Sequence, residues 1–91
     1  MTRELLSFFE DEALLRAFEV VAEERKIRFA ALLEALGAER NDALDRLGKL
    51  EDEGLIKSQN APGQVEDLRW YSMTAKGLAA ERELHRLRLV H

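Results

Sequence analysis

Cysteine, proline and long apolar runs are the scarce features of this sequence. The chain of 91 residues contains no cysteine, which excludes a disulfide framework and any thiolate metal or catalytic site. No apolar run approaches the roughly 18 residues that a membrane span needs. Acidic residues interrupt the N-terminal stretch where a signal peptide would have its apolar core. These absences predict a cytoplasmic protein with no membrane partner.

One proline and five glycines are too few for a fibrous or disordered chain. The sequence is 46% hydrophobic and 35% charged, which is typical of a globular protein, and we expect residues 1–91 to form a single domain. A domain of this size buries only about 60 to 65% of the surface that its unfolded chain exposes. We therefore expect its stability to draw on a partner subunit, which favours a homodimer.

Positive charge is also in short supply, since the formal net charge is −4. An acidic chain is unlike a general nucleic-acid binder, which usually carries a basic surface. The charge is unevenly distributed, however. Acids outnumber bases in residues 1–24 and 39–53, whereas bases outnumber acids in residues 25–38 and 75–91. Two basic islands, "RKIR" and the C-terminal tail, thus stand in an acidic chain.

Helical periodicity dominates the first half of the chain. Ser7 and Glu10 have the spacing of a capping box, and apolar residues then recur every three or four positions, which predicts a helix over about residues 8–24. Ile27 alternates with charged neighbours and predicts a short strand over residues 26–29. Apolar faces return over 30–36 and 40–53. Gly37 and Gly54 stand where left-handed residues commonly end helices.

The second half of the chain predicts a hairpin followed by one more helix. Pro62 and Gly63 mark a turn between two apolar segments, so we expect a β-hairpin over residues 55–73. Trp70 and Tyr71 must point to opposite faces of their strand, and one of them should belong to the core. Thr74 is placed to cap a final helix over residues 75–90.

These elements predict a mainly α fold with a small β-hairpin, in the α+β class. The segments "FAALLEALGAERNDALDRLGKLEDEGLI" and "RWYSMTAKG" resemble the winged helix-turn-helix domain of transcription regulators of the MarR, PadR and ArsR kind. The phrase Leu-Glu-x-x-Gly-Leu-Ile occupies residues 50–56, and Arg-x-Tyr-x-apolar-Thr-x-x-Gly occupies residues 69–77. The resemblance covers roughly residues 13–80 and leaves an extra C-terminal helix beyond it.

The resemblance implies a dimeric, repressor-like regulator of transcription that binds double-stranded DNA. Its recognition helix would be the segment 40–53, lying in the major groove, and the hairpin would be the wing. A small-molecule effector is compatible with such a regulator, but the sequence contains no readable ligand motif. The candidate DNA contacts are Arg28, Arg40, Asn41, Arg46, Lys49, Lys57 and Arg69. Arg69 has an alternative role, since it could instead pair with Glu66 or Asp67.

The predicted recognition helix departs from the resemblance in its charge. Its outward side carries three acids, Asp42, Asp45 and Asp52, against two bases. Carboxylates repel the phosphates whose neutralisation supplies most of the affinity for DNA. The wing tip "QNAPGQVED" contains no base. The alternative of a winged-helix module that binds other proteins and not DNA therefore stays open.

Apolar residues near the two ends of the chain predict a dimer interface. The candidates are Leu5, Leu6, Phe9, Ala80, Leu84 and Leu87. The same residues of the last helix could instead cover the first helix of their own chain. His85 and His91 have no ligand partner at metal-site spacing, and no serine has a histidine placed as its base. We therefore expect no metal, no cofactor and no enzymatic activity.

Overall fold

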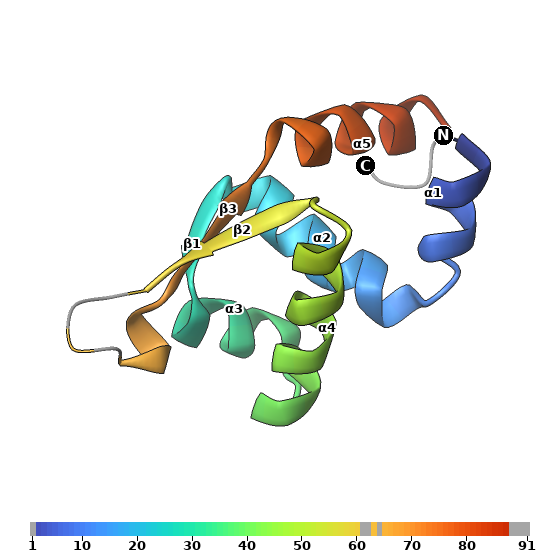
Figure 1. Ribbon diagram of the computed structural model, residues 1–91. Coiled ribbons are helices and arrows are strands. Elements are labelled where there is room, and N and C mark those ends of the chain that lie inside the picture. Colours follow the sequence, from blue (N-terminus) through green and yellow to red (C-terminus); the bar gives the residue numbers. More distant parts are fainter. Residues whose placement is uncertain (1, 61–62, 64, 88–91) are drawn as a thin grey trace.

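In the part that the structure describes, the chain folds into five α-helices, one short 3-10 helix and a three-stranded sheet. The structure, a computed structural model, describes residues 2–60, 63 and 65–87. The elements run in the order α1 (Thr2–Phe8), α2 (Glu12–Glu24), β1 (Lys26–Arg28), α3 (Phe29–Leu36), α4 (Arg40–Asp52), β2 (Ile56–Gln59), η2 (Glu66–Leu68), β3 (Trp70–Met73) and α5 (Ala75–Arg86). Figure 1 shows the hairpin of β2 and β3 projecting from the helices as a wing. The α+β winged-helix prediction is confirmed.

Two predictions fall partly outside the described residues. The turn expected at Pro62 is one of them. The other is the end of the helix expected over 75–90, because the described helix α5 stops at Arg86 and residues 88–91, including His91, lie beyond the described part. Among the helices that the structure describes, none is both long and apolar enough to cross a membrane.

The sheet combines the hairpin with the short strand near residue 27. Its strand order is β1-β3-β2, and both pairings are antiparallel. Ile27 pairs with Tyr71, and both side chains are buried. Since side chains alternate along a strand, Trp70 and Ser72 point to the opposite face. The sheet therefore has one face toward the helices and one face away from them.

Helix α2 is the centre of the core and packs against α3, α4 and β3. Its apolar stripe is buried at Ala17, Phe18 and Val21. Helix α3 adds Phe29 and Leu32, and no charged side chain of the described residues is buried. Burial of apolar surface, at about 25 cal/mol per Å², is thus the main force that holds the helices to the sheet.

The start of the first long helix differs from the prediction. We expected a helix from about residue 8 with Ser7 as its cap, but Ser7 lies inside α1 and α2 begins at Glu12. The carboxylate of Asp11 accepts hydrogen bonds from the backbone nitrogens of Ala13, at 2.9 Å, and Leu14, at 3.4 Å. Aspartate caps helices as well as serine does, so the cap nearer to the apolar stripe prevails.

Two glycines end helices in the left-handed conformation, as predicted. Gly37 follows α3 with φ of 60°, and Gly54 lies just after α4 with φ of 76°. The backbone nitrogen of Leu55 then donates to the carbonyl of Leu50 at 3.0 Å, which closes the helix end. This turn directs Leu55 into the core at the start of the wing.

The two phrases that carried the resemblance meet in space. The Thr74 hydroxyl donates to the carbonyl of Gly54 at 2.5 Å and accepts from the backbone nitrogen of Gly77 at 2.9 Å. A Cβ atom on Gly77 would lie only 2.0 Å from the carbonyl oxygen of Leu55. Gly77 therefore lets α5 approach the end of α4. We call Gly54, Leu55, Thr74 and Gly77 the base junction.

Candidate nucleic-acid interface

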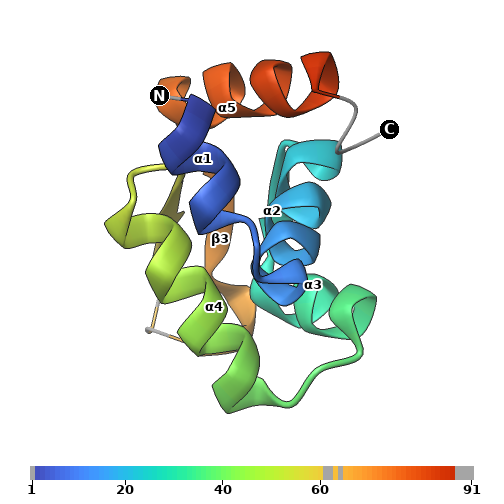
Figure 2. The same cartoon turned by 90° about the vertical axis from the view of Figure 1, so that its right-hand side faces the viewer.

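Helices α3 and α4 form a helix-turn-helix in which α4 lies at the surface. The inner side of α4 is buried through Ala43, Leu47 and Leu50. Figure 2 shows α4 running down one side of the molecule, with its first turn far from α5. Its outward side carries the exposed residues Asn41, Asp42, Asp45, Lys49 and Asp52. The helix predicted to read DNA is therefore not covered by its own chain.

Arg40, at the start of α4, forms ion pairs with η2, the short helix that we call the stem of the wing. Its guanidinium forms ion pairs with Glu66 at 2.6 Å and Asp67 at 2.8 Å, and these carboxylates raise its pKa. The guanidinium carbon also lies 5.3 Å from the centre of the Phe29 ring. Two acids thus offset the charge of this candidate contact. We call Arg40, Glu66 and Asp67 the wing clamp.

Arg69 has a different partner from either of the two expected. The carboxylates of Glu66 and Asp67 form ion pairs with Arg40. The guanidinium of Arg69 instead donates through Nη1 to the hydroxyl of Tyr71 at 3.5 Å. This hydrogen bond is the main reason that the pKa of Arg69 is raised. Burial in turn raises the pKa of Tyr71, the opposite of what the arginine does to it. Arg69 is therefore partly buried beside the core and does not project from the wing.

The remaining candidates on α4 differ in whether their side chains have a hydrogen-bond or ion-pair partner. The ammonium of Lys49 lies 3.4 Å from the carboxylate of Asp45, one turn earlier. Asn41 is exposed and Arg46 is partly buried, and neither has a hydrogen-bond or ion-pair partner within the described ranges. Asn41 and Arg46 are thus the groups of this helix best able to bind an external ligand.

Arg28 and Lys57 do not join α4. Arg28 pairs with Trp70 and Lys57 with Ser72 across the sheet, which puts both on the face away from the helices. Arg28 donates to the carbonyl of Leu68 at 3.0 Å and lies over the ring of Trp70. Six of the seven predicted contacts therefore divide between two separate surfaces, and the partly buried Arg69 belongs to neither. Sequence reasoning missed this division, although the alternation of β1 would have indicated it.

Most of the predicted dimer residues are buried in their own chain. Leu5, Phe9, Ala80 and Leu84 are all less than a tenth exposed within the single chain. Leu6 remains 39% exposed, and Leu87 is partly buried. Four of the six side chains are thus buried within the single chain. A dimer interface would use Leu6 and Leu87 from this set.

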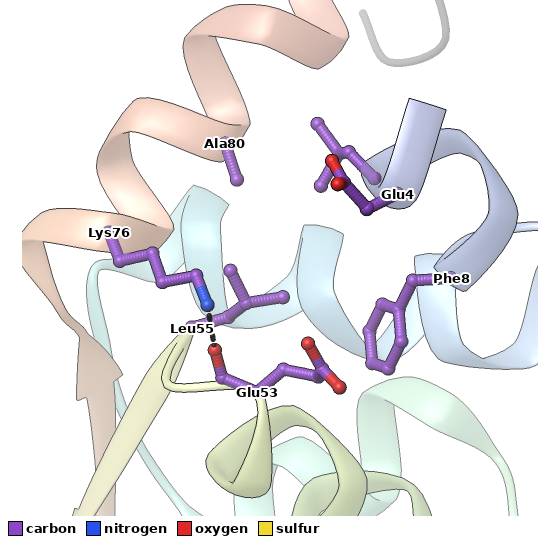
Figure 3. A pocket seen from close by; sticks show the side chains of 7 residues that line it. Glu4, Phe8, Glu53, Leu55, Lys76 and Ala80 are labelled. Carbon is purple, nitrogen blue, oxygen red and sulfur yellow. Dashed lines mark hydrogen bonds between the residues drawn. The ribbon is translucent and has the colours of Figure 1, made fainter. Parts of the chain in front are cut away.

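A cavity of about 450 Å³ lies where α1 and α5 meet the end of α4. Figure 3 shows Phe8, Leu55 and Ala80 around it, together with the carboxylates of Glu4 and Glu53. The ammonium of Lys76 donates to the backbone carbonyl of Glu53 at 2.6 Å. Lys76 and Leu5 also line the cavity. No local pattern in the sequence indicated this cavity, because its walls come from three separate segments.

Comparison with solved structures identifies the fold, whereas no protein-family model and no curated protein matches the sequence. A MarR family transcriptional regulator from Silicibacter pomeroyi is 20% identical, with a TM-score of 0.75 over 94% of this chain and 57% of that one. A mutant MarR from E. coli complexed with operator DNA is 17% identical, with a TM-score of 0.74 over 94% and 61%. YusO from Bacillus subtilis is 16% identical, with a TM-score of 0.71 over 92% and 62%.

These comparisons show that the chain has the winged-helix fold of MarR-family transcriptional regulators. The chain spans only 57% to 62% of the length of these three proteins. The similarity covers 92% to 94% of the present chain.

Proposed function

We propose that this chain is a DNA-binding regulator of transcription that reads the major groove with α4. The observation that carries the proposal is an uncovered α4 beside a wing, in a fold shared with a MarR complexed with operator DNA. A major groove about 12 Å wide admits a single helix, and only the exposed side of that helix can reach the base edges.

Asn41 and Arg46 are the proposed groups for reading bases. Asparagine forms two hydrogen bonds with adenine, and arginine forms two with guanine. Asn41 stands in the first turn of α4, where recognition helices usually contact base edges. Lys49 pairs only with an exposed carboxylate, and such a pair contributes little, so a phosphate can replace Asp45 as its partner.

Two copies are proposed to act together. The DNA site would then be two-fold related, with half-sites about 34 Å apart. Leu6 on α1 and Leu78 on α5, each 39% exposed, and the partly buried Leu87 just after α5 supply apolar surface for such a contact. Occupancy of a promoter by this dimer would block polymerase sterically.

Titration of duplex DNA at several salt concentrations tests the proposal. We expect binding that weakens steeply with salt, and an N41A/R46A variant that binds at least about tenfold more weakly because two base contacts are lost. The matched control is Arg82→Ala, which removes an exposed cation of α5. Unchanged affinity in the N41A/R46A variant would contradict the proposal.

The charge of α4 favours a second candidate function, a module for protein contacts. Its outward side exposes Asp42, Asp45 and Asp52, and carboxylates offset both Arg40 and Lys49. This module would keep the fold and use α4 to bind a basic protein surface. An Asp42→Lys variant that loses a protein complex, together with an Arg46→Ala variant that leaves DNA association unchanged, would establish it.

A further inference from the structure

The sheet presents a surface without acidic residues on its side away from the helices. Lys26, Ser72 and Lys57 are paired across the three strands, as are Arg28, Trp70 and Gln59. We call these six residues the outer sheet face. Three of them are cationic and none is acidic, in a chain whose net charge is −4. A cluster of three cations in an acidic chain therefore lies on the face of the sheet away from the helices.

Interactions with Trp70 orient two of these cations without offsetting their charge. The guanidinium carbon of Arg28 lies 4.2 Å from the centre of the indole ring, and the ammonium of Lys26 lies 4.7 Å from it. An aromatic ring attracts a cation through its quadrupole and carries no net charge. Lys57 is exposed and has no hydrogen-bond or ion-pair partner in the part of the chain that the structure describes. The outer sheet face thus keeps its full positive charge, unlike the wing clamp.

We propose that the outer sheet face docks a carboxylate-rich segment of another protein. Arginine and tryptophan are the residues in which binding energy concentrates at protein interfaces, and the partly exposed Trp70 lies between Arg28 and Gln59. Complementary charge accelerates association and fixes its register. Since neighbouring strands are about 4.8 Å apart, Lys26 and Lys57 stand about 10 Å apart, a span that a few carboxylates of one short segment match.

Nucleic acid fits this surface less well for two reasons. Binding of single strands relies on open aromatic faces on which bases stack, whereas Lys26 and Arg28 already lie against the ring of Trp70. A duplex held by α4 would lie on the helical side of the sheet, because α2 and α3 cover the opposite face of the same strands. The docking surface is therefore independent of the proposed DNA contact.

Trp70 is the only tryptophan of the chain, so its fluorescence reports binding at this face directly. We expect octaglutamate to change the fluorescence saturably, with an affinity that falls as salt is raised. A K26E/K57E variant should bind at least about tenfold more weakly. The milder Lys57→Gln variant should show a smaller loss, and circular dichroism would check that both remain folded.

An R16E/R82E variant is the matched control, since it changes two exposed arginines elsewhere and shifts the net charge equally. It should bind the peptide with nearly unchanged affinity, as should the N41A/R46A variant, which separates this proposal from DNA binding by α4. Absence of saturable binding, or an equal loss in the control, would overturn the proposal. Tighter binding of a single-stranded or duplex oligonucleotide through the same lysines would do so too. Self-association of the chain that K26E/K57E abolishes would also overturn it, by assigning the face to a second copy.

Discussion

Two of the contacts that hold the wing to the helices are built differently. At the base junction, the contacts join backbone atoms to the Thr74 hydroxyl, and Gly77 is buried against Leu55. At the wing clamp, the contacts join the ends of long side chains, of which Arg40 is 45% exposed, Glu66 39% and Asp67 49%. The base junction is short-range and protected, whereas the wing clamp is ionic and open to solvent.

This difference separates what fixes the fold from what sets the position of the wing. Buried backbone contacts tolerate no added atom, because the surrounding structure cannot move away at low cost. Exposed ion pairs contribute little to stability and weaken with salt. We infer that the base of the wing is rigid. The part of the wing at the wing clamp can instead change its position relative to α4 in response to ions and phosphates.

Gly77→Ala should produce the largest effect. The new Cβ would lie 2.0 Å from the carbonyl oxygen of Leu55, so α5 must shift, and we expect a loss of stability of at least about 2 to 3 kcal/mol. Urea unfolding measures it. The matched control is Gly48→Ala in α4, where nothing beyond the neighbouring residues and backbone of the same helix lies within 4 Å of the new Cβ. The control should stabilise the protein by about 1 kcal/mol, and equal stabilities of the two variants would show that the base junction does accommodate an added atom.

Thr74→Ala should have the next largest effect. It removes the helix cap of α5 and the hydrogen bond to Gly54, and we expect a loss of about 1 to 2 kcal/mol in the free energy of unfolding. Thr74→Ser keeps the hydroxyl and should retain most of the stability. If both variants lose the same amount, the methyl group of Thr74 and not its hydroxyl holds the base junction.

The burial of Tyr71, on β3 between the base junction and the wing clamp, predicts a loss of stability in alkaline solution. Burial raises its pKa above the value of about 10 that an unfolded chain would show. Its contribution is therefore fully present below pH 10 and is lost as the pH rises through the folded-state pKa. Tyr71 is the only tyrosine of the chain, so phenolate absorbance follows its ionisation directly. Tyr71→Phe should abolish this part of the pH dependence, and its persistence in that variant would assign the effect to other groups.

Arg40→Ala should change stability least, because the wing clamp is exposed. Its informative readout is the salt dependence of DNA binding. Since carboxylates already neutralise Arg40, its removal should leave the salt slope unchanged, whereas Lys49→Ala, which removes the proposed phosphate contact, should lower the slope by about one. An E66Q/D67N variant should free Arg40 and steepen the slope. A slope that falls in Arg40→Ala would instead show that Arg40 contacts phosphate.

Local patterns predicted the parts of the fold that local chemistry determines. Gly37 and Gly54 end their helices because they adopt the left-handed conformation that other residues disfavour. The short strand at Ile27 was readable from alternation alone. The start of α2 was not, because Ser7 and Asp11 are both good caps and only their place relative to the apolar stripe decides between them.

Contacts between distant segments could not be predicted in the same way. Glu66, a partner of Arg40, lies 26 residues away in η2. Nothing in the sequence favours Arg40 over Arg69 as the partner of Glu66. Leu84 is apolar on a helix whether it faces its own chain or a second copy, so periodicity alone could not decide. The gathering of Lys26, Arg28 and Lys57 on one face depended on the strand register.

The strand order leaves β1 and β2 as the two edges of the sheet. Unpaired edge strands can recruit strands from other molecules and seed aggregation. Here the edges are short, three and four residues, and each carries a lysine at its outer face, Lys26 on one and Lys57 on the other. A second molecule that extended the sheet at either edge would have to bury the charge of that edge's lysine or lie against it. The same two lysines are thus expected to oppose extension of the sheet by a second molecule.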